Sequence, residues 1–252
     1  MVSASTTFHR LCVNFFLILF FFLLTLSKNT QIYKTINYLS HIATTTPPNK
    51  VTTFITYNNI NTMEDIAQFN ISKLPKKISI RPFLKKDIDE LLHLESLGFP
   101  SEERCSRETV EYRIANCPDL CQGLFVKNDD GNTQLIGEIM ATKIDSEFIT
   151  LNTMEIGQHK ESSDVIAIHS VVIHPDYQGQ NLARLLMTDY IQKMSQQSVG
   201  RKITIIVHEH LFKFYEKLGF VKLNENDDVN DPNSDFSKNG VWYNMDKELV
   251  DF

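Results

Sequence analysis

The chain has 252 residues and a formal net charge of −6, with 25 Lys and Arg against 31 Asp and Glu. The charge is uneven: residues 1–63 hold four basic and no acidic residues, which leaves 21 basic and 31 acidic residues, a net charge of −10, for the remainder. An acidic domain argues against a nucleic-acid partner and is compatible with a cationic substrate. The length allows one large domain or two small ones.

The amino terminus is dominated by an apolar segment. Residues 11–26 are almost wholly apolar, and Phe15–Leu24 is unbroken. This is shorter than the roughly 20 residues that span a bilayer comfortably. The pattern therefore fits a signal-like or anchoring segment, or an extension in front of a true start at Met63. We assign residues 1–27 to this segment, 28–76 to a disordered linker, and 77–252 to the folded domain.

The flanking charges bear on where the domain works. Arg10 precedes the apolar segment and Lys28 and Lys34 follow it, which favours a cytosolic C-terminal side even if the segment is an anchor. We expect a cytoplasmic domain, with membrane contact only through residues 11–26. The cysteines lack metal-type spacing, and reduced thiols are the expected state of Cys12, Cys105, Cys117 and Cys121.

Apolar periodicity predicts the elements of the domain in chain order. A first strand covers 77–83, helices follow at 84–97 and 106–114, and Ser106 is a good N-cap for the second. Asn128-Asp-Asp-Gly131 predicts a hairpin turn between strands at 120–127 and 133–143, and 146–156 is expected to extend this meander. The remaining expectations are strands at 165–173, 202–208, 220–223 and 241–245, and helices at 181–197 and 209–218. This order predicts an α/β (α+β) fold whose mixed central sheet contains one parallel crossover.

The segment from Val165 to Arg184 is the most informative part of the sequence. A β-branched strand is stopped by Pro175-Asp176, and a short polar loop then opens an amphipathic helix. The first turn of a helix leaves backbone N–H groups unpaired and pointing outward, which makes a natural phosphate site. We therefore expect a pyrophosphate-bearing ligand to bind between residues 178 and 184.

Three segments in this order resemble the GNAT superfamily of acetyl-CoA-dependent N-acetyltransferases. They are the strand Ile166–Ile173, the loop-helix Gln178–Arg184, and Phe214-Tyr-Glu-Lys-Leu-Gly-Phe220. Within the superfamily the chain looks closest to the serotonin/arylalkylamine branch, and closer still to fungal polyamine N-acetyltransferases. The resemblance covers about residues 78 to 249. It implies the GNAT fold, with about six to seven strands and about four helices.

The resemblance also implies how acetyl-CoA, as co-substrate, would be held. The family loop usually reads Gln/Arg-x-x-Gly-x-Gly/Ala; Gln178 and Ala183 match its ends, and Asn181 replaces the middle glycine. Asn tolerates positive φ better than other residues that carry a side chain, so the nest of N–H groups can still form. The preceding strand should offer a backbone N–H to the thioester oxygen through a splay or bulge. The implied cofactor residues are Val171, Val172, Ile173, Gln178, Gly179, Gln180, Asn181, Leu182, Ala183 and Arg184.

Two side chains carry the implied chemistry. Serotonin-acetylating relatives have two histidines, two residues apart, on the strand before the loop; His169 matches the second, and Ala167 replaces the first. His169 is our candidate base, acting through ordered water, and its alternative role is a core-edge histidine bonded to backbone. Tyr215 is the candidate proton donor to the departing thiolate. Its alternative role is packing between Phe212 and Phe220.

The acceptor amine has weaker candidates. Phe99, Glu102 and Glu103 lie in the loop where relatives place acceptor-binding elements, and either carboxylate could hold a cationic nitrogen, act as an alternative base, or simply be solvated. The acidic run 225–235 could attract polyamines but is typical of a solvated loop. His208 and His210 flank Glu209 without a third ligand, so we expect a structural role and no metal.

The leading function is acetyl transfer from acetyl-CoA to a primary amine of a polyamine or arylalkylamine, by a monomer. A protein N-acetyltransferase acting on α-amines or lysines is the second possibility. A membrane-tethered CoA-binding module with weak or lost catalysis is the third, because Ala167 interrupts the histidine pair and the amino terminus is apolar.

Overall fold

The computed structural model describes residues 77–128 and 130–249. The predictions for residues 1–27 and 28–76, including the apolar segment at 11–26, lie outside this part of the chain. Within it, no helix is long and apolar enough to cross a membrane.

The first elements form as the sequence predicts. Strand β1 (Ile78–Pro82) leads through a 3₁₀ turn into helix α4 (Ile88–Gly98), and α5 (Arg107–Asn116) follows. Asp87 fixes the entry to α4, because its carboxylate accepts the Leu84 N–H at 2.7 Å and two bonds from Arg81 at 2.6 and 3.0 Å. The Ser106 hydroxyl accepts the Thr109 N–H and caps α5, as predicted.

The next hairpin is confirmed, but its predicted extension is wrong. β2 (Gln122–Lys127) pairs with β3 (Thr133–Ile144), whereas residues 146–156 do not continue the meander. A single helical turn, α6 (Leu151–Met154), lies there instead. The side chains and amides of Thr150 and Thr153 bond each other reciprocally, and this local capping overrides strand propensity.

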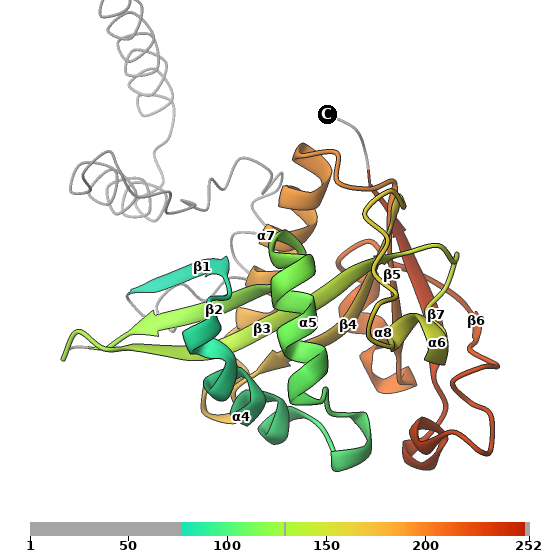
Figure 1. Cartoon of the computed structure of the whole chain (residues 1–252), viewed down its shortest axis with the longest axis horizontal. Coiled ribbons are helices and arrows are strands. Elements are labelled where there is room, and N and C mark those ends of the chain that lie inside the picture. The colour runs from blue at the N-terminus through green and yellow to red at the C-terminus, as the bar shows by residue number, and fades with distance from the viewer. Residues whose placement is uncertain (1–76, 129, 250–252) are drawn as a thin grey trace, which may run out of the picture. The chain divides into compact units, whose positions relative to one another are not determined.

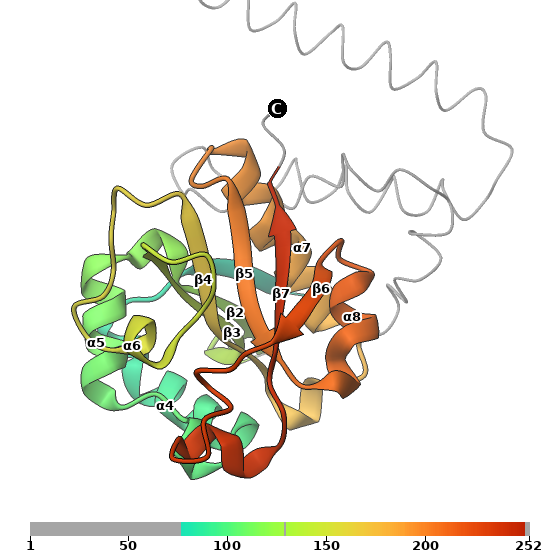
Figure 2. The same ribbon diagram turned by 90° about the vertical axis from the view of Figure 1, so that its right-hand side faces the viewer.

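The second half supplies the parallel crossover. β4 (Val165–Ile173) leads into α7 (Leu182–Gln196), which returns the chain to β5 (Lys202–Val207). After α8 (Phe212–Glu216) come β6 (Val221–Glu225) and β7 (Tyr243–Glu248). The seven-stranded order is β1-β2-β3-β4-β5-β7-β6, and only β4 and β5 are parallel among the strands of the described region. Figure 2 shows β4, β5, β7 and β6 side by side. The predicted mixed sheet is confirmed.

Helices cover both faces of the sheet. In Figure 1, α4 and α5 lie in front of the sheet and α7 behind it; Figure 2 shows the same two sides, with α8 on the α7 side. The predicted apolar stripe of α7 packs inward, because Leu182, Leu186 and Tyr190 are buried. The Tyr190 hydroxyl also donates to the Leu120 carbonyl at 3.2 Å, so its polar end is satisfied.

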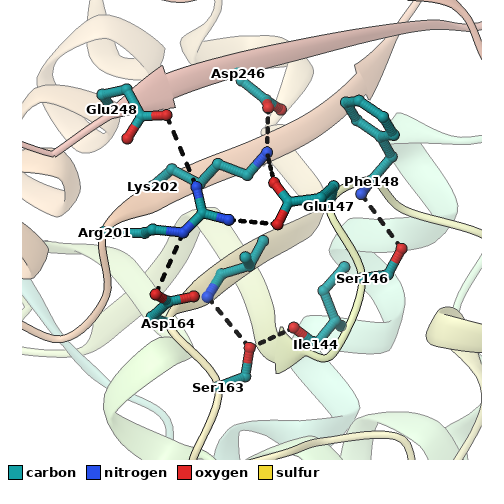
Figure 3. A network of polar contacts seen from close by, with 11 residues as sticks. Ile144, Ser146, Glu147, Phe148, Ser163, Asp164, Arg201, Lys202, Asp246 and Glu248 are labelled. Carbon is teal, nitrogen blue, oxygen red and sulfur yellow. Dashed lines mark hydrogen bonds and ion pairs between the residues drawn. The ribbon is translucent and has the colours of Figure 1, made fainter.

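A network of charges joins the amino-terminal ends of β4 and β5 (Figure 3). Lys202, with only 4% of its side chain exposed, pairs with Asp246 on β7 and with Glu147 at 3.0 Å. Arg201 binds Glu147 at 2.5 Å and Asp164 at 3.2 Å. Three segments that are distant in sequence are therefore held together where the parallel pairing begins.

Because Lys202 is buried against Asp246, whose side chain is only 14% exposed, we expect Lys202→Met to lower the free energy of unfolding by about 3 kcal/mol, since it leaves that carboxylate without its lysine partner. The matched control is Lys238→Met, which breaks an exposed pair with Asp235 and should cost less than about 1 kcal/mol. Urea unfolding of both variants measures the difference. Equal losses would contradict a structural role for the buried network.

Candidate active site

The two parallel strands separate partway along their length. β4 and β5 pair at only three positions, Val165↔Lys202, Ile166↔Ile203 and Ala167↔Thr204. β4 then continues to Ile173 without a β5 partner, while β5 pairs with β7 on its other edge from Lys202 to Val207. The second half of β4 therefore has an edge toward β5 whose backbone groups are available to an extended ligand.

A β-bulge marks the start of this unpaired half. On the β3 side Met140 is opposite Ser170, but Ala141 is opposite Ile168, so His169 is an extra residue on β4. The sequence places the irregularity within Val171–Ile173, and the structure places it two residues earlier. A bulge turns the strand and re-aims its side chains, which fits its position beside the open edge.

His169 is fixed by a partner on β3. Its Nε2 lies 2.8 Å from the Thr142 Oγ1, whereas its Nδ1 is enclosed and has no hydrogen-bond partner among the described residues. Burial, and secondarily the Arg113 guanidinium, hold the pKa of His169 well below 6.5. The imidazole is therefore neutral at pH 7 and retains a nitrogen that can accept a proton. The backbone-bonded alternative for this ring is not what the structure shows.

The loop between β4 and α7 has the backbone shape of an anion site. Gly179 has φ +72° and Asn181 has φ 61° and ψ 16°, so Asn181 does adopt the left-handed conformation that the family glycine would take. The Leu185 N–H, bonded to the Asn181 carbonyl, makes the first helical bond of α7. Amides before it point toward the loop, where a helix N-terminus favours negative charge. The Gln178 amide donates to the Ile173 carbonyl at 3.1 Å and ties the loop to β4.

Tyr215 lies on α8, which follows β5. It is 7% exposed and packs edge-on against Phe214 and Phe220, with ring centroids 5.0 and 5.5 Å away. The expected packing partner Phe212 instead contacts Tyr243. Burial raises the pKa of Tyr215 to about 12, so the phenol keeps its proton throughout the neutral and alkaline range.

The predicted acceptor residues occupy a loop that is tied to another loop. The Glu103 carboxylate accepts a bond from the Asn239 amide at 2.8 Å, which joins the turn at 101–103 to the turn at 235–239. Glu102 is fully exposed, and hydrogen bonds from its own backbone and from Ser101 lower its pKa. Phe99 is half-buried against the main core. No hydrogen bond or ion pair joins Glu102 or Glu103 to His169 within residues 77–249.

The histidine pair after β5 is packed. His208 lies against Trp242 with ring centroids 3.9 Å apart, stacks on His210, and bonds the Val241 carbonyl through Nδ1 at 3.0 Å. These contacts are those of structural side chains. Among the described residues, no group of three or more His, Cys, Asp or Glu is arranged to hold a metal ion. Cys105, Cys117 and Cys121 are free thiols.

Sequence reasoning missed the polar groups beneath the bulge. Glu138 on β3, Glu95 on α4 and Arg113 on α5 are 0%, 1% and 3% exposed. One signal was present in the sequence: Glu138 interrupts the apolar run from Leu135 to Ala141, where an acidic residue is unexpected. Glu95 and Arg113 lie at ordinary helical positions and gave no such signal.

Comparisons with known proteins agree with this geometry. Residues 138–244 match the family model described as an acetyltransferase (GNAT) domain. An uncharacterized N-acetyltransferase, ycf52 of Porphyra purpurea, is 31% identical over 98 residues, which is 39% of this chain and 46% of that protein. The serotonin N-acetyltransferase of Mesocricetus auratus is 23% identical over 113 residues, 45% of this chain and 51% of that protein. The chain thus spans about half the length of these curated relatives.

Among solved structures, the loading GNATL domain of CurA from Lyngbya majuscula superimposes with a TM-score of 0.56 at 18% identity, covering 68% of this chain and 98% of that domain. The described region has the GNAT fold. Residues 138–244, less than half of the chain, are thus similar to a GNAT acetyltransferase domain and lie within a region that has the GNAT fold.

Proposed function

We propose that the protein transfers the acetyl group of acetyl-CoA to a primary amine of a small cationic molecule, a polyamine or an arylalkylamine. The observation that carries the proposal is the separation of β4 from β5 after Ala167, next to the left-handed Gly179 and Asn181 at the start of α7. An extended arm and a pyrophosphate need these two features side by side.

The residues present fit acetyl-CoA at this place. Backbone N–H groups from Gly179 to Arg184 hold the pyrophosphate at the N-terminus of α7, a helix of 15 residues. A Cβ added to Gly179 would meet no atom within 4 Å, so the loop is open on that side. Val171, Val172 and Ile173 present the unpaired edge of β4 to the pantetheine arm and the thioester.

His169 and Tyr215 move the two protons of the reaction. A free alkylamine has a pKa of about 10.4, so it arrives protonated and must lose a proton before its nitrogen attacks the thioester carbon. His169, neutral at pH 7, takes that proton through water. The C–N bond forms and the C–S bond breaks. Tyr215 gives its proton to the departing sulfur and is reprotonated, through water, by the second proton that the nitrogen loses.

A small amine fits better than a protein substrate on two grounds. The chain is similar over 113 residues to a serotonin N-acetyltransferase, and the domain is acidic, which suits a cationic acceptor. The test is turnover of acetyl-CoA with spermidine, tryptamine and a lysine-containing peptide in parallel. Preference for the peptide would move the assignment to protein acetylation, and acetyl-CoA binding without turnover of any amine would favour the inactive tethered module.

Tyr215→Phe should lower kcat by about 10²- to 10⁴-fold while acetyl-CoA binding changes little, because ring packing remains and only the proton donor is lost. With the pKa of Tyr215 raised to about 12, the wild-type protein should show no loss of this donor up to pH 10. The matched control is Tyr190→Phe, which removes a buried hydroxyl on α7 that bonds Leu120. A Tyr215 variant with the kcat of the control would leave this tyrosine with a packing role only.

His169→Ala should reduce kcat/KM most at low pH, with a loss that shrinks as pH approaches the amine pKa of about 10. The folded-state pKa lies well below 6.5, so the wild-type base stays neutral from pH 6.5 upward. Glu103→Gln is the matched comparison, since Glu103 is the alternative base and is engaged by Asn239. Profiles of kcat/KM from pH 6 to 9 separate the two candidates. A larger pH-dependent loss in Glu103→Gln would identify Glu103 as the base, and losses that do not change with pH in both variants would exclude both residues as the base.

We further propose that the domain acts in the cytoplasm, where acetyl-CoA is available. Asn70-Ile-Ser72 is a glycosylation acceptor only in the secretory lumen, so it reports on location. We expect Asn70 to be unmodified in native cells, as judged by mass spectrometry with and without a glycosidase. An attached glycan would place the domain in the lumen.

A further inference from the structure

Three polar side chains from different elements meet beneath the bulge, on the side covered by α4 and α5. Glu138 comes from β3, Glu95 from α4 and Ser170 from β4, and they are 0%, 1% and 6% exposed. Their burial is unusual for acidic residues, which are almost never fully buried without a partner. Glu95 and Ser170 both lie close enough to Glu138 to change the pKa of its carboxyl group.

Most of the oxygens in this cluster are unsatisfied within the described region. Both carboxyl oxygens of Glu138, Oε1 of Glu95 and the Ser170 hydroxyl are buried without a hydrogen-bond partner. Only Oε2 of Glu95 is bonded, to the Cys105 N–H at 2.9 Å. Burial, reinforced by the neighbouring Glu95, raises the pKa of Glu138 well above 4.5, which favours the protonated form of its carboxyl group. It is thus the member of the cluster that brings an acidic proton to a set of acceptors.

The position of Glu138 connects it to the reacting strand. Its cross-strand neighbour on β4 is Val172, and Ser170 directly follows the bulged His169. Beyond Ala167, β4 lacks a partner on the β5 side, so its position is determined from β3. Two side chains of β3, four residues apart on one face, approach the bulge: Thr142 contacts His169, and Glu138 lies near Ser170.

We propose that Glu138 is a positioning residue for acetyl transfer, because its carboxyl group is buried beside Glu95 and Ser170, across from β4, and so holds the bulge that presents His169. This inference rests on the proposed function. The other titratable groups around the cluster are Cys105 beyond α4, Arg113 on α5, Cys121 before β2 and His169 itself. Arg113 is bonded to the Cys105 sulfur and the Met154 carbonyl, so Glu138 has no direct guanidinium partner in the described structure.

The proton makes the arrangement sensitive to alkaline pH. When Glu138 loses it, a carboxylate is left beside Glu95 with no compensating cation, and the two acidic side chains repel. Ser170 and the bulge then lose their support, so kcat should fall as the pH rises through the raised pKa of Glu138. The free energy of unfolding should also fall as the pH rises. The pKa of Glu138 is higher in the folded than in the unfolded protein, so stability is lost between about pH 4.5 and the folded-state pKa.

The test compares Glu138→Gln, which stays neutral with nearly the same shape, with Glu138→Leu, which cannot hydrogen bond. Glu138→Gln should keep near-wild-type kcat and lose the alkaline fall. Glu138→Leu should lower kcat about tenfold to a hundredfold at every pH, with the KM for acetyl-CoA unchanged, because His169 is displaced. Glu111→Gln, an exposed glutamate on α5, is the matched control and should retain the wild-type profile.

A structural role alone would change the melting temperature of these variants but leave the kcat profile unchanged. A folded Glu138→Leu protein with wild-type kcat, or a Glu138→Gln protein that keeps the alkaline fall, would overturn the inference. If Glu138→Leu does not fold, the pH profile of kcat for Glu138→Gln alone tests the inference. The two proposals fail differently: a wild-type protein that turns over no amine refutes the proposed function, whereas an active protein indifferent to Glu138 refutes only this role.

Discussion

The one-sided hydrogen bonding of β4 is the constraint on which the candidate site depends. From Ile168 to Ile173 the strand is paired with β3 but not with β5, although β5 runs parallel to it for three residues before this point. A sheet interior normally satisfies both edges of a strand, because buried N–H and C=O groups are costly to leave unmade. An edge left open in the middle of a sheet is thus a place for a ligand that brings its own peptide-like groups. The loop with left-handed Gly179 and Asn181 follows at the end of the same strand, so in the proposed function one strand and its loop would contact both ends of a long ligand.

The separation of β4 from β5 requires that the two strands be held together firmly where they still pair. The charge network around Lys202 lies at the three-residue pairing, and it joins β5 to β7 and to the β3–β4 connection. On the other side Thr142 binds the bulged His169. The strands are therefore fixed where they meet and along the β3 side, and they are free of each other only where the ligand would lie. The paired first halves of β4 and β5 stabilise the sheet, and the separated second half of β4 leaves backbone groups accessible.

The sequence predicts the framework well, because most of it follows from local chemistry. The strand and loop from Val165 to Asn181, the Ser106 cap and the apolar stripe of α7 were all visible as patterns, and the structure confirms them. The segment 146–156 was mispredicted because two threonines form a local capping arrangement that strand propensity does not register. The bulge was expected within Val171–Ile173 and lies two residues earlier, at His169. It is a property of the register between β3 and β4, which depends on how both strands pack.

The polar groups under the bulge show why the rest of the site was hidden. The buried polar side chains come from three different elements, namely Glu95, Glu138 and Ser170. Their spacing along the chain does not predict that they lie close together. Buried oxygens without partners each cost on the order of 1–3 kcal/mol, so a core selected for stability alone would fill this place with apolar side chains. The fold can accept that loss here because most of the buried apolar side chains of the described region form one large cluster around the sheet. A costly cluster directly beneath the only unpaired stretch of β4 is most simply understood as part of the machinery that holds this strand in its reactive geometry.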